Sequence, residues 1–303
     1  MAGNTLIRDA WDYLRNARIV RTALDYSTLP SDYFKSAPWP GNDAVSFEKV
    51  HTYVMFLGIG RSGTTLVGSL LDAHPNAVIA NEQNTLKYLY PFSFSREQIF
   101  QMLLDNSVRQ AELGRPGGGG YSYAVPGQSQ GVFENIEVIG DKSRSAQSIE
   151  WFTSRPDLLQ RLSRTTQAQI VMLHVIRNPF DTIARRSLRR GVSLERISRQ
   201  YFALSTQLKV LFRRFEAEQE LGVKSVALHL EDLIRDPAPV LTVLCDSLGI
   251  RHMPAYLEAC AGIVREKPSL ARELVSWSPE LIAEIQQEME SFSWMRSYSF
   301  EAS

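Results

Sequence analysis

The sequence predicts a three-layer α/β fold, with helices on both faces of a central, mainly parallel sheet of about five strands. Three observations support this fold class. Short apolar runs alternate with segments of helical periodicity. One of these runs leads through a glycine-rich turn into a helix. Another, at residues 170–176, is apolar enough to be buried on both faces of a sheet.

The chain begins with a segment that does not fit the strand-and-helix alternation. Residues 5–28 have apolar side chains at helical spacing, and residues 29–46 are rich in Pro, Ser and Asp. We therefore expect residues 1–46 to form a helical arm outside a single domain at 47–303, a length that can bury a sizeable core.

The expected strands are the short runs rich in β-branched and apolar residues. In chain order they cover residues 53–57, 77–80, 136–140, 170–176 and 225–230.

The expected helices begin and end at residues typical of helix termini. Asn178 and Pro179 are typical of an N-cap and a first helical residue, and Gly249 of a helix end. The remaining helical segments cover residues 64–73, 96–113, 145–163 with a break near Pro156, 194–221, 237–248, 255–264 and 279–289.

Residues 114–131 interrupt this pattern with a glycine- and proline-rich insertion. Two interpretations remain open. The insertion could be disordered, or it could be a mobile flap over an acceptor site that makes contact through Tyr121 and Tyr123.

Composition excludes several partner classes. The 33 Lys and Arg residues balance 33 Asp and Glu residues, so no global field favours nucleic acid or an anionic membrane. Cys245 and Cys260 lack metal-ligand spacing and are expected to be reduced core thiols. Charged residues near the N-terminus argue against a secretory signal, and no apolar run reaches the roughly 18–20 residues of a membrane span. We expect a cytoplasmic protein without a metal.

The turn between residues 58 and 63 is the most informative stretch. Gly58 and Gly63 have the spacing of a P-loop, which the segment resembles, so the expected fold is P-loop NTPase-like. Thr64, however, stands where such NTPases carry a lysine, and Arg61 supplies a cation inside the turn. Backbone amides, the hydroxyls of Thr64 and Thr65 and a guanidinium suit an anion that is not held through Mg²⁺.

Other polar residues follow the predicted strands directly. Glu82, the segment 141–143 and Arg177 each lie just beyond a strand end. Because ligands of parallel sheets bind beyond the carboxyl ends of the strands, we expect these residues to meet the glycine-rich turn at one edge.

Two segments together resemble a known family. GIGRSGTTLVGSLLDAHPN and VIRNPFDTIARRS are similar to the two nucleotide-binding signatures of sulfotransferases that use 3′-phosphoadenosine 5′-phosphosulfate (PAPS). The similarity in style is greatest to tyrosylprotein sulfotransferases and related bacterial enzymes. HLEDLIRDPAPVLTVLCDSLGI extends the resemblance, which covers roughly residues 53–250.

The resemblance implies roles for individual residues. Arg177 would bind the 3′-phosphate, with Arg185 as second ligand, because position 185 holds an arginine where relatives carry a serine. Ser187 lies two positions further, rotated by roughly 200° around a helix. Lys267 and Arg272 would line the adenine pocket. The cradle of the 5′-phosphosulfate would consist of Arg61, Ser62, Gly63, Thr64 and Thr65.

The implied reaction moves the sulfuryl group of PAPS to a hydroxyl, rather than an amine, of a small-molecule acceptor by in-line attack, leaving PAP as product. Glu82 would be the general base, with Glu134 as a weaker substitute, while Lys142 and Arg61 neutralise charge. His74, a base by residue type, is expected to be a structural cap. No metal is required.

Two other function classes compete with this one. A Mg-NTP-dependent kinase or ATPase would want a lysine at position 64 and a strand-terminal aspartate, for which Asp141 comes closest. A non-enzymatic nucleotide-binding protein would leave Glu82 and Lys142 without a role. The acceptor stays open, since the aromatic residues that could line its cleft could equally be core: Tyr88, Tyr90, Phe92, Phe94 and Trp151.

Overall fold

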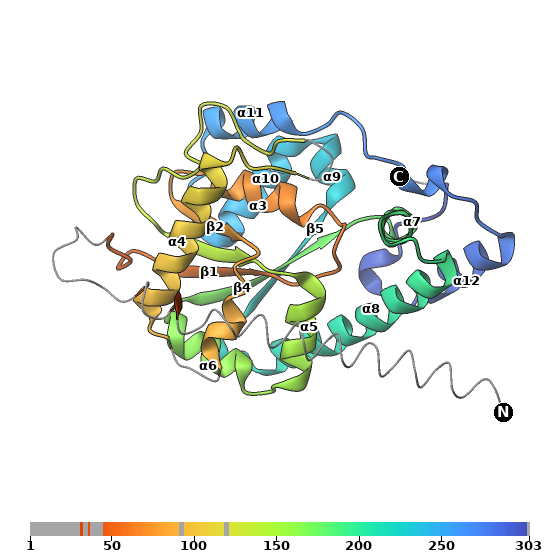
Figure 1. Cartoon of the computed structure of the whole chain (residues 1–303), viewed down its shortest axis with the longest axis horizontal. Coiled ribbons are helices and arrows are strands. Elements are labelled where there is room, and N and C mark those ends of the chain that lie inside the picture. Colours follow the sequence, from red (N-terminus) through yellow and green to blue (C-terminus); the bar gives the residue numbers. More distant parts are fainter. Residues whose placement is uncertain (1–30, 33–35, 37–44, 91–93, 118–120, 302–303) are drawn as a thin grey trace.

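Five strands form one parallel sheet, as the sequence predicts (Figure 1). The computed structural model describes residues 31–32, 36, 45–90, 94–117 and 121–301, so most of the expected N-terminal arm and Phe92 lie outside the described residues. The spatial order is β2-β3-β1-β4-β5, and all four neighbouring pairs are parallel. The strands are β1 (Thr52–Phe56), β2 (Ala77–Asn81), β3 (Val138–Lys142), β4 (Gln169–Ile176) and β5 (Lys224–His229).

Helices cover both faces of this sheet, which makes the three layers (Figure 1). One layer holds α3 (Thr64–Asp72), α9 (Leu230–Arg235), α10 (Pro237–Leu248) and α11 (Pro254–Ile263). The other holds α5 (Ser145–Ser154), α6 (Leu158–Thr166) and α8 (Leu194–Ala217), with α12 (Pro279–Met289) against α8. The remaining elements are α4 (Arg96–Glu112) beside β2, α7 (Pro179–Arg190) after β4, and the short turns η1 (Thr85–Leu89), η2 (Gln219–Leu221), η3 (Ala271–Leu274) and η4 (Ser293–Met295).

The core consists of two apolar clusters, one on each face of the sheet. Alternate residues of β1 divide between them, since Tyr53 and Met55 join one cluster and Val54 and Phe56 the other. In β4 all residues except the first are buried, which confirms that this strand is covered on both faces. The sheet is therefore a rigid base for the loops at its carboxyl edge.

Two expected elements differ from those observed. The third strand begins at Val138 rather than at residue 136 and continues through Lys142, because its ladder with β2 extends to the pair Asn81–Lys142. The break expected near Pro156 is confirmed, because α5 ends at Ser154 and α6 begins at Leu158, but α6 continues to Thr166 rather than to residue 163. The first difference matters for function, since Lys142 lies in the sheet rather than in a loop.

The glycine- and proline-rich insertion is tied to the rest of the domain. Arg115 is buried and forms an ion pair with Asp72 at the end of α3. Pro116 and Ser122 form an antiparallel bridge, and Gln130 Nε2 donates to the carbonyl of Ser69 at 2.9 Å. Residues 114–117 and 121–131 are therefore an ordered part of the fold, and the disordered interpretation is wrong for them.

Candidate active site

The glycine-rich turn between β1 and α3 has the backbone geometry of an anion cradle. Arg61 and Gly63 have φ angles of 84° and 94°, in the left-handed region, which turns neighbouring amides toward one side. No side chain caps the N-terminus of α3, so the amides of its first turn are open to a ligand. A Cβ on Gly63 would lie 2.6 Å from the Cδ1 methyl of Leu230, and the φ of 94° itself disfavours any residue other than glycine.

The predicted second anion ligand, Arg177, adjoins this turn. Its guanidinium donates to the carbonyl of Arg61 at 3.3 Å and to the carbonyl of Ser269. Burial lowers the pKa of Arg177, opposed by the charges of Asp181 and Glu231. The two stretches that the sequence predicts as phosphate ligands are thus brought together.

The start of α7 holds Arg177 in place. Asn178 caps the helix by accepting from the Phe180 amide at 3.0 Å, as predicted. The buried carboxylate of Glu231 accepts from the Asn178 amide at 2.9 Å and from the Tyr298 hydroxyl at 2.7 Å. Sequence reasoning missed Glu231, although it lies in the HLEDL segment of the family resemblance.

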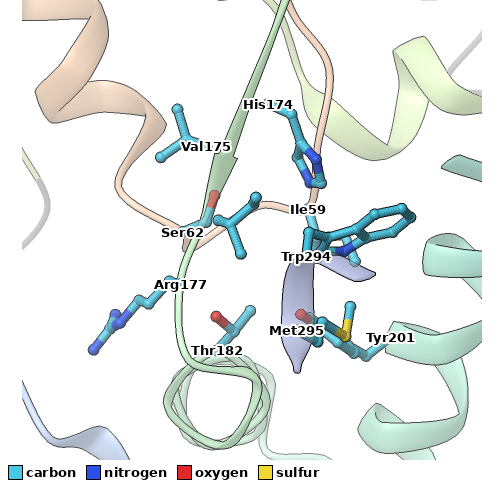
Figure 2. Close-up of a pocket in the computed structure, with 10 residues that line it drawn as sticks. Ile59, Ser62, His174, Val175, Arg177, Thr182, Tyr201, Trp294 and Met295 are labelled. Atoms are coloured by element: carbon cyan, nitrogen blue, oxygen red, sulfur yellow. The ribbon is translucent and has the colours of Figure 1, made fainter. Parts of the chain in front are cut away.

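A small pocket lies beneath the turn (Figure 2). His174, Trp294 and Met295 lie on one side, and the Arg177 guanidinium is directed away from them. Ser62 Oγ and Thr182 Oγ1 also line the pocket, and both atoms are buried without a hydrogen-bond partner in the described part of the chain. Burial lowers the pKa of His174 to about 3, so this side of the pocket is uncharged.

Glu82, the predicted base, is clamped between two cations at the end of β2. Lys142 Nζ lies 2.8 Å from Oε1 and Arg144 Nε 3.1 Å from Oε2. Burial acts to raise the pKa of Glu82, but the charges and hydrogen bonds of Lys142 and Arg144 outweigh it, and the pKa is lowered. The structure brings Glu82 and Lys142 together as expected; Arg144 was missed, although it follows two residues after Lys142.

Asp141 accepts hydrogen bonds from the backbone turn that follows Glu82 and so stabilises it. Glu82 and Asn84 have φ angles of 58° and 68°, strained values for residues other than glycine. The buried Asp141 carboxylate accepts from the amides of Gln83 and Thr85 at 3.2 and 2.8 Å and from the Ser143 hydroxyl at 2.7 Å. Asp141 therefore fixes the turn and has little capacity left for a metal ion.

The other predicted nucleotide ligands have different surroundings. Arg185 is exposed on α7, and Ser187 Oγ donates to the Val192 carbonyl at 2.6 Å. Lys267 is exposed in the loop after α11. Arg272 is buried and pairs with Asp181 at 3.1 Å, which fastens η3 to α7. Its contact with a nucleotide stays a prediction.

His74 and the two cysteines lie in the structural positions expected of them, and the structure decides the position of the aromatic residues whose role was open. His74 accepts from the Asn76 amide at 3.0 Å and contacts the Arg251 carbonyl at 2.8 Å, as a cap should. Tyr88, Phe94 and Trp151 belong to the core, whereas Tyr90 is exposed. Cys245 and Cys260 are buried, and burial raises the pKa of each thiol to about 12.

Neither a membrane-spanning helix nor a metal-binding cluster occurs among the described residues. Within them no helix is long and apolar enough to cross a membrane. In the same part of the chain no group of three or more His, Cys, Asp or Glu side chains could hold a metal ion.

Comparisons with known proteins place the chain in a family. A family model described as "Sulfotransferase family" matches residues 54–254, about two thirds of the chain, whereas no curated protein matches. Among solved structures, the sulfotransferase domain of an olefin synthase from Synechococcus PCC 7002 is 19% identical, with a TM-score of 0.49, covering 84% of this chain and 98% of that one. A sulfotransferase domain from the curacin biosynthetic pathway is 15% identical, with a TM-score of 0.47 and coverages of 80% and 98%. Sulfotransferase STF9 from Mycobacterium avium is 11% identical, with a TM-score of 0.45 and coverages of 89% and 82%.

The match to the family model covers more than half of the chain. That match contains the glycine-rich turn, Glu82, Lys142 and Arg177. The chain belongs to the sulfotransferase family, the PAPS-dependent enzymes that its two signatures resemble.

Proposed function

We propose that this chain moves the sulfuryl group of PAPS to a hydroxyl group of a small-molecule acceptor. The observation that carries the proposal is the meeting of Glu82 and Lys142 at 2.8 Å beside the glycine-rich turn. Lys142 packs against α3, since a Cβ on Gly68 would lie 3.4 Å from its Cβ. A proton acceptor and a cation thus stand next to an anion cradle, the combination that sulfuryl transfer requires.

The glycine-rich turn and Arg177 together suit the two phosphate ends of the nucleotide. Uncapped amides at the start of α3 suit the 5′-phosphosulfate, and the exposed Arg61 adds charge there. Arg177 Nε is buried without a partner among the described residues, which fits a guanidinium that receives a 3′-phosphate. We assign Arg61, Ser62, Gly63, Thr64 and Thr65 to the 5′ end, and Arg177 with Arg185 to the 3′ end.

Three side chains then perform the transfer. PAPS supplies the sulfuryl group: the acceptor oxygen bonds to sulfur while the bond from sulfur to the 5′-phosphate oxygen breaks. Glu82 takes the proton of the acceptor hydroxyl. Lys142 and Arg61 supply positive charge where the departing oxygen becomes negative. A shift of Lys142 toward that oxygen would also weaken its pairing with Glu82, which would make the carboxylate a stronger base.

A binding measurement separates this function from the kinase alternative. We expect PAP to raise the melting temperature without Mg²⁺, and ATP with Mg²⁺ to have no effect. The opposite pattern would favour an NTP-dependent enzyme. Asp141 argues against that outcome, because its carboxylate already accepts hydrogen bonds from Gln83, Thr85 and Ser143. Turnover is then tested by incubating acceptor pools with PAPS and following the mass gain of a sulfonate group.

A further inference from the structure

The ordered insertion carries two tyrosines to the neighbourhood of the predicted nucleotide site. Tyr121 and Tyr123 lie on the hairpin that begins at the anchored Arg115, with their ring centroids 4.9 Å apart at 69°. The Tyr121 hydroxyl donates to the Ile263 carbonyl at 2.5 Å, at the end of α11. The hairpin therefore packs beside the loop that follows α11.

Arg265, in the loop that follows α11, makes a second contact with the hairpin. The guanidinium carbon of the exposed Arg265 lies 5.0 Å from the centroid of the Tyr121 ring, in a cation–π arrangement that favours this position of the side chain. Arg265 thus has a defined position, and the hairpin supplies the ring that defines it.

The loop that holds Arg265 also contacts the predicted 3′-phosphate ligand, because the Arg177 guanidinium donates to the carbonyl of Ser269 in that loop. The charges of Arg265 and Arg185 both act to lower the pKa of Tyr123, although burial is the larger cause and the pKa is raised overall. Burial lowers the pKa of Arg177, and the charge of Arg185 acts in the same direction. Among the described residues neither Arg185 nor Arg265 has a carboxylate within ion-pair distance.

We infer that the tyrosine hairpin belongs to the nucleotide site, where Tyr123 and Arg265 join Arg185 as ligands of a ribose 3′-phosphate and Tyr121 positions Arg265. The inference rests on the proposed function. It replaces the expected flap over the acceptor by a contact with the sulfuryl donor. A hydroxyl donor and two guanidiniums suit a phosphate dianion. Such a site would select a 3′-phosphorylated nucleotide over one with a free 3′-hydroxyl.

Calorimetric binding of PAP and of adenosine 5′-monophosphate, which lacks the 3′-phosphate, tests this assignment. We expect Arg265→Gln to weaken PAP binding about tenfold or more, and Tyr123→Phe by roughly two- to tenfold, with little change for the monophosphate. Arg189→Gln is the matched control, since it removes an exposed cation from the same α7 helix. It should bind PAP like the wild type.

A positioning role for Tyr121 has its own readout. Tyr121→Phe keeps the ring under Arg265 and should bind PAP nearly like the wild type, whereas Tyr121→Leu removes the ring and should show part of the Arg265→Gln loss. Equal loss in both variants would contradict positioning through the ring.

The outcomes separate the inference from the proposed function. A wild type that does not bind PAP would overturn the proposed function. A wild type that binds PAP, with Arg265→Gln and Tyr123→Phe binding it equally well, would overturn the inference alone. A Tyr123→Phe variant that changes only the KM of the acceptor would restore the acceptor-flap interpretation.

Discussion

The two halves of the candidate site are built differently. Around Arg61 and Gly63 the anion cradle is backbone, fixed by left-handed φ angles and by the close approach of Leu230. Around Glu82 the arrangement depends on side chains, with a half-exposed carboxylate between Lys142 and Arg144. We expect the first half to tolerate no added atom at Gly63, and the second half to keep its shape when the chemistry of a side chain is changed.

The largest effect is expected from Gly63→Ala. The added Cβ meets Leu230 at 2.6 Å, and φ at this position is 94°. We expect a loss of about 2–4 kcal/mol in the free energy of unfolding and no measurable PAP binding. Urea unfolding and calorimetry measure the two effects. Gly60→Ala is the control, because a Cβ there has no neighbour within 4 Å; similar losses in both variants would show that the loop is not held by this contact.

A substitution at Glu82 should lower turnover without weakening the binding of the nucleotide. Glu82→Gln keeps the size of the side chain but cannot accept the proton of the acceptor, so we expect kcat to fall by up to about 10⁴-fold with PAP affinity unchanged. Steady-state kinetics with the identified acceptor measure kcat, and calorimetry measures the affinity for PAP. Glu134→Gln, an exposed carboxylate that the sequence offered as a weaker base, should retain full activity. An active Glu82→Gln variant would remove Glu82 from the mechanism.

The difference between a cradle built from backbone and an arrangement built from side chains also explains which parts of the site could be predicted from the sequence. The cradle was predictable because a local signal, the spacing of glycines after a strand, determines its backbone. The sheet order brought Glu82 and Lys142 to one edge, which strand-end logic also predicts. The clamp by Arg144, the turn held by Asp141 and the contact of Tyr121 with Arg265 depend on side-chain packing between distant segments, which no local pattern encodes.

Lys142→Ala should reduce kcat by about 10²–10³ while PAP affinity is largely retained. It should also move the acid limb of the pH profile of kcat/KM to higher pH, because burial raises the pKa of Glu82 and Lys142 is the largest opposing influence. The stabilisation from this pair is present above the unfolded-state pKa and is lost as pH falls through the lowered folded-state pKa. Proportional losses of PAP affinity and kcat would instead make Lys142 a simple nucleotide ligand.

The smallest effect is expected at Ser187, which lies on α7 two positions after Arg185. Its hydroxyl donates to the Val192 carbonyl at 2.6 Å, near the end of α7, and so has a structural partner. Ser187→Ala should cost about 0.5–1.5 kcal/mol of unfolding free energy and leave PAP affinity unchanged, whereas Arg185→Gln should weaken PAP binding about tenfold with little loss of stability. Calorimetry and urea unfolding of the two variants measure both quantities. If Ser187→Ala weakened PAP binding more than Arg185→Gln, the 3′-phosphate would lie on the other side of α7, and the ligand set around Arg177 would have to be redrawn with serine in place of arginine.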